Sequence, residues 1–482
     1  MLFSTSYFAF FFPIVFACYW FVFNRNIKIQ NGLLLSSSYF FYACWDWRFV
    51  FLLMFSTFLD YFIGLKIFKS KQLKTKKIWF WVSIIINLGF LGVFKYFNFF
   101  SESFSALFSK VGFTVDPITI NVILPIGISF YTFHGLSYII DVFNNKIKPE
   151  ENIVDYSLFV CYFPLLVAGP IERATHLLPQ IKSSRKFNFA NSIDGLRQIL
   201  WGLFKKIVIA DNCFELVNLV FDNPMYYSSI TLIVGAILFA FQIYCDFSGY
   251  SDIALGISRL LGIELLRNFD FPYFSRDIAE FWRKWHISLS SWFKDYVYIP
   301  LGGSKGGSWN KVRNIFIIFL LSGFWHGANW TFLVWGFLNA VYYLPILFFN
   351  KNRAHISVVA SGKLLPNLKE FLLIVFTFAL SVFAWIFFRA ENIGDAFEYI
   401  NGIFSFNDSY KLTFPNSFNG MKVSFFLISF VLIEWLGREG KHALERIENI
   451  LNKPIRLFFY YCLIFAIIWF GGKEQQFIYF QF

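Results

Sequence analysis

Residues 228–250 read SSITLIVGAILFAFQIYCDFSGY, a mainly apolar run with a polar end. An α-helix needs about 20 apolar residues to cross the hydrocarbon core of a bilayer, so this run predicts a membrane-spanning helix. Similar runs recur along the chain. The predicted spans lie near residues 6–23, 48–68, 78–97, 118–142, 228–250, 314–349, 370–390, 422–437 and 455–471.

Shorter or more mixed segments lie near residues 31–45, 154–169 and 193–222, and we expect partial crossings and interfacial helices among them. Of the 482 residues, 57% are apolar and only 15% are charged, with a mean hydropathy of +0.55. A soluble protein carries about 25% charged residues. We therefore predict an all-α, polytopic membrane protein with about 10–13 transmembrane or re-entrant helices. One membrane domain accounts for residues 1–482.

The formal charge of +12 has a topological explanation. Basic residues gather between apolar runs, as expected for cytoplasmic loops that face anionic lipid. We therefore predict membrane lipid as a partner and no nucleic acid. The scattered cysteines have no metal-binding spacing, so no metal site is predicted. One short loop carries six lysines: Lys66, Lys69, Lys71, Lys74, Lys76 and Lys77.

Residues 268–307 are too charged to cross lipid, yet apolar side chains recur there at helical spacing. His286 lies at the edge of this stripe, where the apolar and polar faces meet. One interpretation is an interfacial helix anchored by tryptophans. The other is a re-entrant or interfacial helix that lines a water-filled cavity. The stripe consists of Ile278, Phe281, Trp282, Trp285, Leu289, Trp292, Phe293 and Tyr296.

A second histidine, His326, lies in the apolar stretch SGFWHGANW at residues 322–330. Such a histidine is often only a hydrogen-bonded packing residue. Ionisable groups in membrane segments are costly, however, and tend to mark functional sites. Farther upstream, Asp246 lies at the polar end of the apolar run 228–250, and Asp252 follows it. These carboxylates either orient a histidine or line a polar cavity, or they cap a helix end.

Together these stretches resemble the membrane-bound O-acyltransferase (MBOAT) family. The similarity is strongest to its bacterial branch of alginate O-acetylases and PatA-type peptidoglycan O-acetyltransferases. The matching motifs are YCDFSGYSDIALGISRLLGI, NFDFPYFSRDIAEFWRKWHISLSSWFKDYVYIPLGG and SGFWHGANWTFLVWG. Weaker matches are FVCYFPLLVAGPIER, GLFKKIVIAD and WIFFRA.

The resemblance implies a ring of membrane helices around a central tunnel, with the acyl donor entering from the cytoplasm. It implies that His326 is the catalytic histidine and His286 the second functional histidine. Arg276, Arg283 and Lys284 are candidates for binding a phosphate-bearing donor, although a solvated face would look the same. The candidates for orienting the histidines are Asp246, Asp252 and Asn329.

The implied chemistry suits these residues. Acyl transfer from a thioester to a hydroxyl needs a base for the hydroxyl proton and donors for the oxyanion. A neutral His326 in an apolar tunnel can act as that base, because burial disfavours the charged form. His286 either orients the donor or shares the handling of the proton.

The aromatic segment FIYFQF at residues 477–482 follows the last predicted span. It is either an interfacial anchor or, by resemblance to the C-terminal tyrosine motif of alginate and peptidoglycan acetylases, an acyl relay. In the second interpretation Tyr479 carries the acyl group to an extracytoplasmic transferase. This segment favours acetyl over D-alanyl transfer, since D-alanylating relatives typically lack it.

We therefore expect an O-acetyltransferase of the bacterial cytoplasmic (inner) membrane. The expected donor is acetyl-CoA, with no bound cofactor. The expected acceptor is an extracytoplasmic polysaccharide such as alginate or peptidoglycan, reached through an SGNH-like, AlgJ-type partner. The alternatives are D-alanyl transfer or acylation of a lipid or protein within the same family, or a transporter. The transporter alternative is disfavoured because the chain shows no related repeats.

Overall fold

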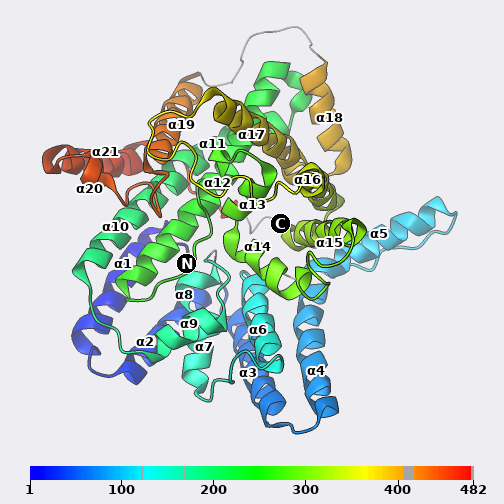
Figure 1. The fold of residues 1–482 in the computed structure, drawn as a ribbon, viewed down its shortest axis with the longest axis vertical. Helices are drawn as coiled ribbons and strands as arrows, with labels where there is room; N and C mark the ends of the chain where they lie inside the picture. Colours follow the sequence, from blue (N-terminus) through cyan, green and yellow to red (C-terminus); the bar gives the residue numbers. More distant parts are fainter. Residues whose placement is uncertain (121–122, 168, 406–416, 479–482) are drawn as a thin grey trace. The chain divides into compact units, whose positions relative to one another are not determined.

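The computed structural model of the chain describes residues 1–120, 123–167, 169–405 and 417–478, which are helical with no strands (Figure 1). This confirms the all-α prediction. Among the described residues, seven helices are long and apolar enough to span a membrane. The predicted 10–13 membrane or re-entrant helices and the tunnel stay predictions.

The chain divides into two compact units. Unit 1 comprises Met1–Ser192 and Ile257–Leu266, and unit 2 comprises Ile193–Gly256 and Arg267–Phe482. The helices of unit 1 are α1 (Ser6–Ala17), α2 (Ile27–Ala43), α3 (Arg48–Lys69), α4 (Leu73–Leu91), α5 (Phe97–Lys110), α6 (Ile128–Phe143), α7 (Ile153–Cys161), α8 (Phe163–Leu166) and α9 (Ala174–Lys182). Short π-helical segments follow α1 (Cys18–Val22) and α4 (Gly92–Tyr96).

In unit 1, α3, α4 and α6 pack side by side (Figure 1). Asp60 of α3 is buried between them, and its carboxylate accepts hydrogen bonds from Ser83 Oγ (2.7 Å) and Asn87 Nδ2 (2.9 Å) of α4. A Cβ at Gly135 of α6 would lie 2.0 Å from Asp60 Oδ2. Only glycine therefore lets α6 approach this buried polar cluster.

The predicted span at 118–142 is wrong at its start, because α6 begins only at Ile128. Gly127 has a left-handed backbone conformation (φ 75°), and a Cβ there would lie 2.2 Å from the carbonyl oxygen of Leu166. Pro125 also precedes the helix, and proline disfavours helical geometry in the residue before it. Hydropathy alone does not detect this break.

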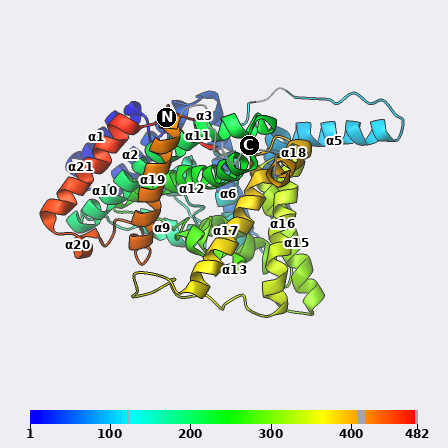
Figure 2. The same cartoon turned by 90° about the horizontal axis from the view of Figure 1, so that it is seen from above.

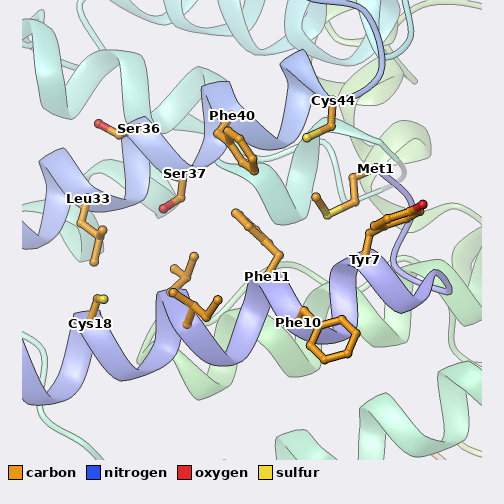
Figure 3. Close-up of a pocket in the computed structure, with 12 residues that line it drawn as sticks. Met1, Tyr7, Phe10, Phe11, Cys18, Leu33, Ser36, Ser37, Phe40 and Cys44 are labelled. Carbon is orange, nitrogen blue, oxygen red and sulfur yellow. The ribbon is translucent and has the colours of Figure 1, made fainter.

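Unit 1 also contains an apolar groove of about 810 Å³ between α1 and α2. Figure 3 shows Phe11 of α1 and Phe40 of α2 in this groove, where their rings stack at 5.9 Å. Its other walls are mainly aliphatic and aromatic, with Ser36 and Ser37 on α2. None of the predicted site residues lines the groove.

The remaining helices are α10 (Phe189–Leu203), α11 (Asp211–Phe221), α12 (Ser229–Leu260), α13 (Ile278–Lys284), α14 (Ile287–Phe293), α15 (Ser308–His326), α16 (Trp330–Phe348), α17 (Leu368–Arg389), α18 (Ile393–Phe404), α19 (Ser417–Gly437), α20 (Ile447–Ile450) and α21 (Lys453–Phe470). Two π-helical segments (Phe204–Ala210 and Lys294–Tyr298) and two 3₁₀ turns (Pro224–Tyr226 and Pro272–Phe274) complete the set. In unit 2, α15, α16 and α17 lie side by side (Figure 2).

Two predicted segments of unit 2 are broken. The apolar run 314–349 forms two helices, because the chain is extended at Gly327 (φ −161°) before α16 begins. The predicted stripe helix over 278–296 is interrupted at Trp285 and His286. His286 has a left-handed backbone conformation (φ 42°), which separates the first helix from the second.

Candidate functional site

His326 is the last residue of α15, and glycines fix its place. A Cβ at Gly323 of α15 would lie 2.2 Å from the carbonyl oxygen of Phe332 of α16. A Cβ at Gly336 of α16 would lie 2.4 Å from the carbonyl oxygen of Phe319 of α15. The two backbones therefore touch where neither helix has a side chain. At Gly327 the extended chain leaves the helix, so His326 stands at the turn between α15 and α16.

His286 lies at the break between α13 and α14, and Asn268 holds this break. The carbonyl oxygen of Asn268 accepts the N–H of Ile287 at 2.9 Å. Its side chain accepts a hydrogen bond from Ser288 Oγ (2.5 Å) and donates one to Ser251 Oγ of α12 (3.0 Å). One buried asparagine thus ties the left-handed turn at His286 to the long helix α12.

The two histidines are brought together. Their ring centroids lie 6.5 Å apart, and the residues are only 1% (His286) and 3% (His326) exposed. The ring of Trp325 lies 5.9 Å from His286 and 4.8 Å from His326. Phe247 of α12 contacts His286 edge-on at 4.7 Å, and Trp335 contacts His326 at 5.2 Å.

This aromatic enclosure sets the protonation state of His286. Burial lowers its pKa from the ordinary 6.5 to about 3. At neutral pH the ring is therefore uncharged, so one nitrogen can donate a hydrogen bond while the other accepts one. Such a ring can polarise a carbonyl oxygen without bringing a charge into the apolar interior.

The C-terminal segment reaches the same enclosure. Phe477 is fully buried, with its ring 5.9 Å from Phe247 and 4.7 Å from Tyr250. Ile478 is 3% exposed, and its N–H donates to Asp246 Oδ2 at 2.7 Å. Phe247 therefore contacts both Phe477 and His286. Tyr479, the predicted relay, lies outside the described residues.

Comparison with known proteins supplies the family. A model described as MBOAT, membrane-bound O-acyltransferase family, matches residues 147–388, about half of the chain. This match includes both histidines and the break that separates α13 from α14. The chain belongs to the membrane-bound O-acyltransferase family.

Individual relatives agree. The chain is 37% identical over 444 residues to the probable alginate O-acetylase AlgI of Pseudomonas aeruginosa, covering 91% of this chain and 81% of that protein. It is 35% identical over 436 residues to the peptidoglycan O-acetyltransferase of Helicobacter pylori, covering 84% and 80%. A teichoic acid D-alanyltransferase of Bacillus subtilis is 31% identical over 286 residues, covering 56% of this chain and 70% of that protein. The prediction of an O-acyltransferase is confirmed.

In this membrane-bound O-acyltransferase, Asp246 and Asp252 are each held by a lysine. Asp246 Oδ1 lies 2.8 Å from Lys206 Nζ, and Asp252 Oδ2 lies 2.5 Å from Lys205 Nζ. Asp252 also accepts a hydrogen bond from Gln198 Nε2 at 2.8 Å. These contacts place both carboxylates in a charged layer along α12. Their role in orienting a histidine stays a prediction.

Asn329, the third residue predicted to orient the histidines, caps α16. Its Oδ1 accepts the N–H of Thr331 at 3.1 Å, and its Nδ2 donates to the carbonyl oxygen of Glu391 at 2.6 Å. Asn329 lies three residues after His326, and its side chain fixes the start of α16 at Trp330. The turn between α15 and α16 connects Asn329 to His326. That Asn329 orients His326 stays a prediction.

The basic residues predicted to bind the donor contact carboxylates and carbonyl oxygens of the same chain. Arg276 is buried and pairs with Glu280 (3.0 Å) and Glu370 (3.2 Å), and Lys284 pairs with Glu280 at 2.9 Å. The guanidinium of Arg283 instead donates to the carbonyl oxygens of Asn352 and His355. Carbonyl oxygens do not neutralise a cation, so Arg283 is the best suited of the three to an anionic donor.

Sequence reasoning missed three kinds of residue here. Asn268 and Lys206 had weak signals: one lies in the matched motif NFDFPYF, and the other is a lysine in an apolar stretch. The indole N–H groups of Trp285 and Trp385 are buried, with no hydrogen-bond partner among the described residues. Nothing in the sequence marks them, because tryptophan is common throughout the chain.

The other histidines lie elsewhere. In unit 1, His134 Nε2 accepts the N–H of Glu172 (3.0 Å), and His176 Nδ1 lies 2.8 Å from a carboxylate oxygen of Glu172. His442 lies in a polar stretch of the sequence, yet its side chain is buried. It is 3% exposed, and its Nε2 lies 3.0 Å from Asp194 Oδ1. A polar local sequence hides this burial, because the partner comes from a distant segment.

Proposed function

We propose that this enzyme transfers acetyl from acetyl-CoA, at the cytoplasmic face of the bacterial inner membrane, toward a hydroxyl of an extracytoplasmic polysaccharide. The observation that carries the proposal is the pair of buried histidines, His286 and His326, with rings 6.5 Å apart. The pair occurs in a chain whose relatives include proteins named alginate O-acetylase and peptidoglycan O-acetyltransferase.

His326 is the general base. Its unprotonated ring nitrogen takes the proton of the attacking hydroxyl while the hydroxyl oxygen bonds to the thioester carbon. The resulting tetrahedral intermediate collapses when the carbon–sulfur bond breaks. The proton on His326 then passes to the departing thiolate, which returns the histidine to its neutral form. Atoms and charge balance without a further reactant.

His286 polarises the thioester carbonyl. As a neutral ring it donates one N–H to the oxygen that becomes negative in the intermediate. The buried indole N–H of Trp285, the neighbouring residue, is a second candidate donor. Such donors act strongly in an apolar enclosure, because water does not compete with them.

Arg283, with Arg276 and Lys284, binds the phosphates of the donor. The support is electrostatic: the Arg283 guanidinium is held by carbonyl oxygens instead of a carboxylate. The other two cations are shared with Glu280, so their contribution to an anionic ligand is smaller.

Tyr479 accepts the acetyl group from the donor and passes it to an SGNH-like, AlgJ-type partner outside the membrane. The support is the position of the residues before it: Phe477 packs against Phe247, which contacts His286, and Ile478 is also buried. The tyrosine hydroxyl would then be the nucleophile that His326 activates. The polysaccharide is reached only indirectly.

Acetyl is favoured over D-alanyl because of the extent of similarity. The D-alanyltransferase of Bacillus subtilis aligns with 56% of this chain, whereas the relatives named as acetylases align with 84% to 91%. D-Alanyl transfer remains the second candidate function, and a D-alanyl thioester is the matched donor for a comparison.

The experiment uses purified full-length protein in detergent with acetyl-CoA labelled in the acetyl group. We expect the wild type to retain label that hydroxylamine releases, as for an acyl ester. Tyr479→Phe and His326→Ala should retain none, and the control His355→Ala should retain as much as the wild type. Equal label on Tyr479→Phe would exclude the relay, and transfer from only the D-alanyl donor would exclude acetyl.

A further inference from the structure

A buried charge cluster lies outside the histidine site. Lys206 Nζ is 2.8 Å from Asp211 Oδ1 and 2.8 Å from Asp246 Oδ1. The lysine side chain is 1% exposed and each carboxylate 4% exposed. We call these three residues the charge triad. Buried ions are costly unless every lone pair and proton has a partner, so the other contacts of the triad indicate what it holds.

Those other contacts are to the backbone of residues 471–478, which we call the tail. Asp246 Oδ2 accepts the N–H of Ile478 at 2.7 Å. Lys206 Nζ donates to the carbonyl oxygen of Gln475 at 3.1 Å. The anion thus binds a main-chain donor and the cation a main-chain acceptor, three residues apart. Both contacts are charge-assisted, which makes them about twice as strong as neutral hydrogen bonds.

The segment around the triad also holds the start of the tail. Asn212 Nδ2 donates to the carbonyl oxygen of Phe470 at 2.9 Å, and the N–H of Gly472 donates to the carbonyl oxygen of Ile207 at 3.0 Å. A Cβ at Gly472 would lie 2.7 Å from the backbone of Asp211. The tail therefore runs in close backbone contact with residues 207–212.

The triad continues into the aromatic enclosure of the histidines. Lys206 Nζ lies 5.7 Å from the ring centroid of Tyr250, against which Phe477 packs at 4.7 Å. Phe477 also contacts Phe247, whose ring lies 4.7 Å from that of His286. A fixed tail backbone thus fixes the ring of Phe477 next to the functional histidine.

From this geometry we infer that Lys206, Asp211 and Asp246 are positioning residues that clamp the tail backbone and set its register beside His286. Because these contacts are to main-chain atoms, they fix the position of Ile478, from which the chain continues, independently of the side chains of the tail. The use of this register for acyl transfer rests on the proposed function, whereas the clamp itself does not. A covalently attached acceptor held in this way would be presented to the base at high effective concentration.

Hydrogen exchange of the full-length protein in detergent tests the clamp without relying on activity. In Asp246→Asn the loss of charge weakens the bond to the Ile478 N–H, and exchange of the peptide covering residues 471–478 should rise by about tenfold. Lys206→Met should act in the same direction. Unchanged exchange in both folded variants would overturn the clamp.

Two controls separate the clamp from general damage. Gln475→Ala removes a side chain but keeps the carbonyl oxygen that Lys206 binds, so tail exchange should stay at the wild-type level. Asp252 lies on the same helix as Asp246 and forms a neighbouring ion pair with Lys205. Asp252→Asn breaks this ion pair and should also leave tail exchange unchanged. A rise in Asp252→Asn equal to that in Asp246→Asn would contradict a specific clamp.

If Asp246→Asn fails to fold, Ile478→Pro keeps the test decisive. Proline removes the donated N–H and leaves the charge triad intact, so the amides of residues 473–477 should exchange faster. Normal exchange there would overturn the contribution of this hydrogen bond.

A final measurement asks whether the clamp positions the tail for chemistry. With labelled acetyl-CoA, Asp246→Asn should lose label on Tyr479 by about tenfold or more, while hydrolysis of acetyl-CoA to acetate and CoA continues. Unchanged labelling with a released tail would overturn the positioning role. If even the wild type takes no label, the relay fails, and the exchange results still decide whether the clamp exists.

Discussion

At His286 a left-handed backbone (φ 42°) and a buried ring occur in the same residue. Such a conformation costs a non-glycine residue about 1–3 kcal/mol and persists only where the surroundings enforce it. Here Asn268 enforces it, through its hydrogen bonds to Ile287 and Ser288. The strained turn directs the imidazole toward Trp325 and His326.

Burial lowers the pKa of His286 to about 3, and this fixes the sign of its pH effects. In the unfolded chain the residue titrates near 6.5, so its neutral folded form contributes stability above that pH. This contribution is lost as the pH falls from 6.5 toward 3. Between pH 5 and 8 the folded ring stays neutral.

We therefore predict that His286→Gln lowers the rate of acyl transfer without changing the shape of the pH–rate profile between pH 5 and 8. Glutamine keeps a neutral hydrogen-bonding group but does not titrate. The measurement is the rate at half-unit pH steps for both proteins. An acidic limb near pH 6.5 that is present in the wild type and absent from His286→Gln would contradict a neutral His286.

At the residue scale both histidines stand out in the sequence, because a histidine among tryptophans and glycines in an apolar chain is unusual, and the family resemblance supplies the roles predicted for them. The sequence did not reveal Asn268 or Lys206 as supporting residues. Their partners, Ser288 and the carbonyl oxygen of Gln475, are 20 and 269 positions away along the chain. Only the folded chain reveals such pairings.

At the scale of elements, the crossing of α15 and α16 determines where His326 lies. The glycines at 323 and 336 let the two backbones touch. Hydropathy predicted one apolar stretch across residues 314–349, because it averages over this turn. The spacing of the glycines is visible in the sequence, but the sequence does not show which helix packs against them.

Gly323→Ala should therefore destabilise the protein and lower acyl transfer. Its Cβ would lie 2.2 Å from the carbonyl oxygen of Phe332, a backbone atom that cannot move aside alone. Overpacking of this kind costs about 1–3 kcal/mol. The checks are the thermal midpoint in detergent and the transfer rate.

The matched control is Gly89→Ala in α4, where a Cβ meets nothing within 4 Å. Alanine is favoured over glycine in a helix by about 1 kcal/mol, so this variant should be as stable as the wild type or more so. Equal midpoints for Gly323→Ala and the wild type would show that the crossing tolerates a side chain.

At the scale of the whole molecule, composition and hydropathy were sufficient to predict a helical membrane protein. They were less informative about which helices carry the predicted site residues. α15, which ends at His326, is not among the seven candidate spans, because its first turns carry Asn310, Lys311 and Arg313. The helix that carries the predicted base is a mixed one, and hydropathy scores penalise the polar groups that binding and catalysis require.

Orientation in the membrane gives a prediction at this scale. The lysine-rich loop after α3 should face the cytoplasm, and the turn before α3 should face the opposite side, since 22 residues span about 33 Å. In a variant with Cys44 and Cys462 replaced by serine, Ser70→Cys should react with an impermeant maleimide only after spheroplasts are opened. Asp46→Cys should react in intact spheroplasts, and the reverse pattern would contradict this orientation.

The central claim is that His326 is the base for acyl transfer. The most direct test is the rate of CoA release from acetyl-CoA by purified wild type, His326→Ala and the control His355→Ala. The account predicts a rate about 10²–10⁴-fold lower for His326→Ala, the usual contribution of a positioned general base, and a wild-type rate for His355→Ala. A folded His326→Ala protein that releases CoA at the wild-type rate would contradict the claim.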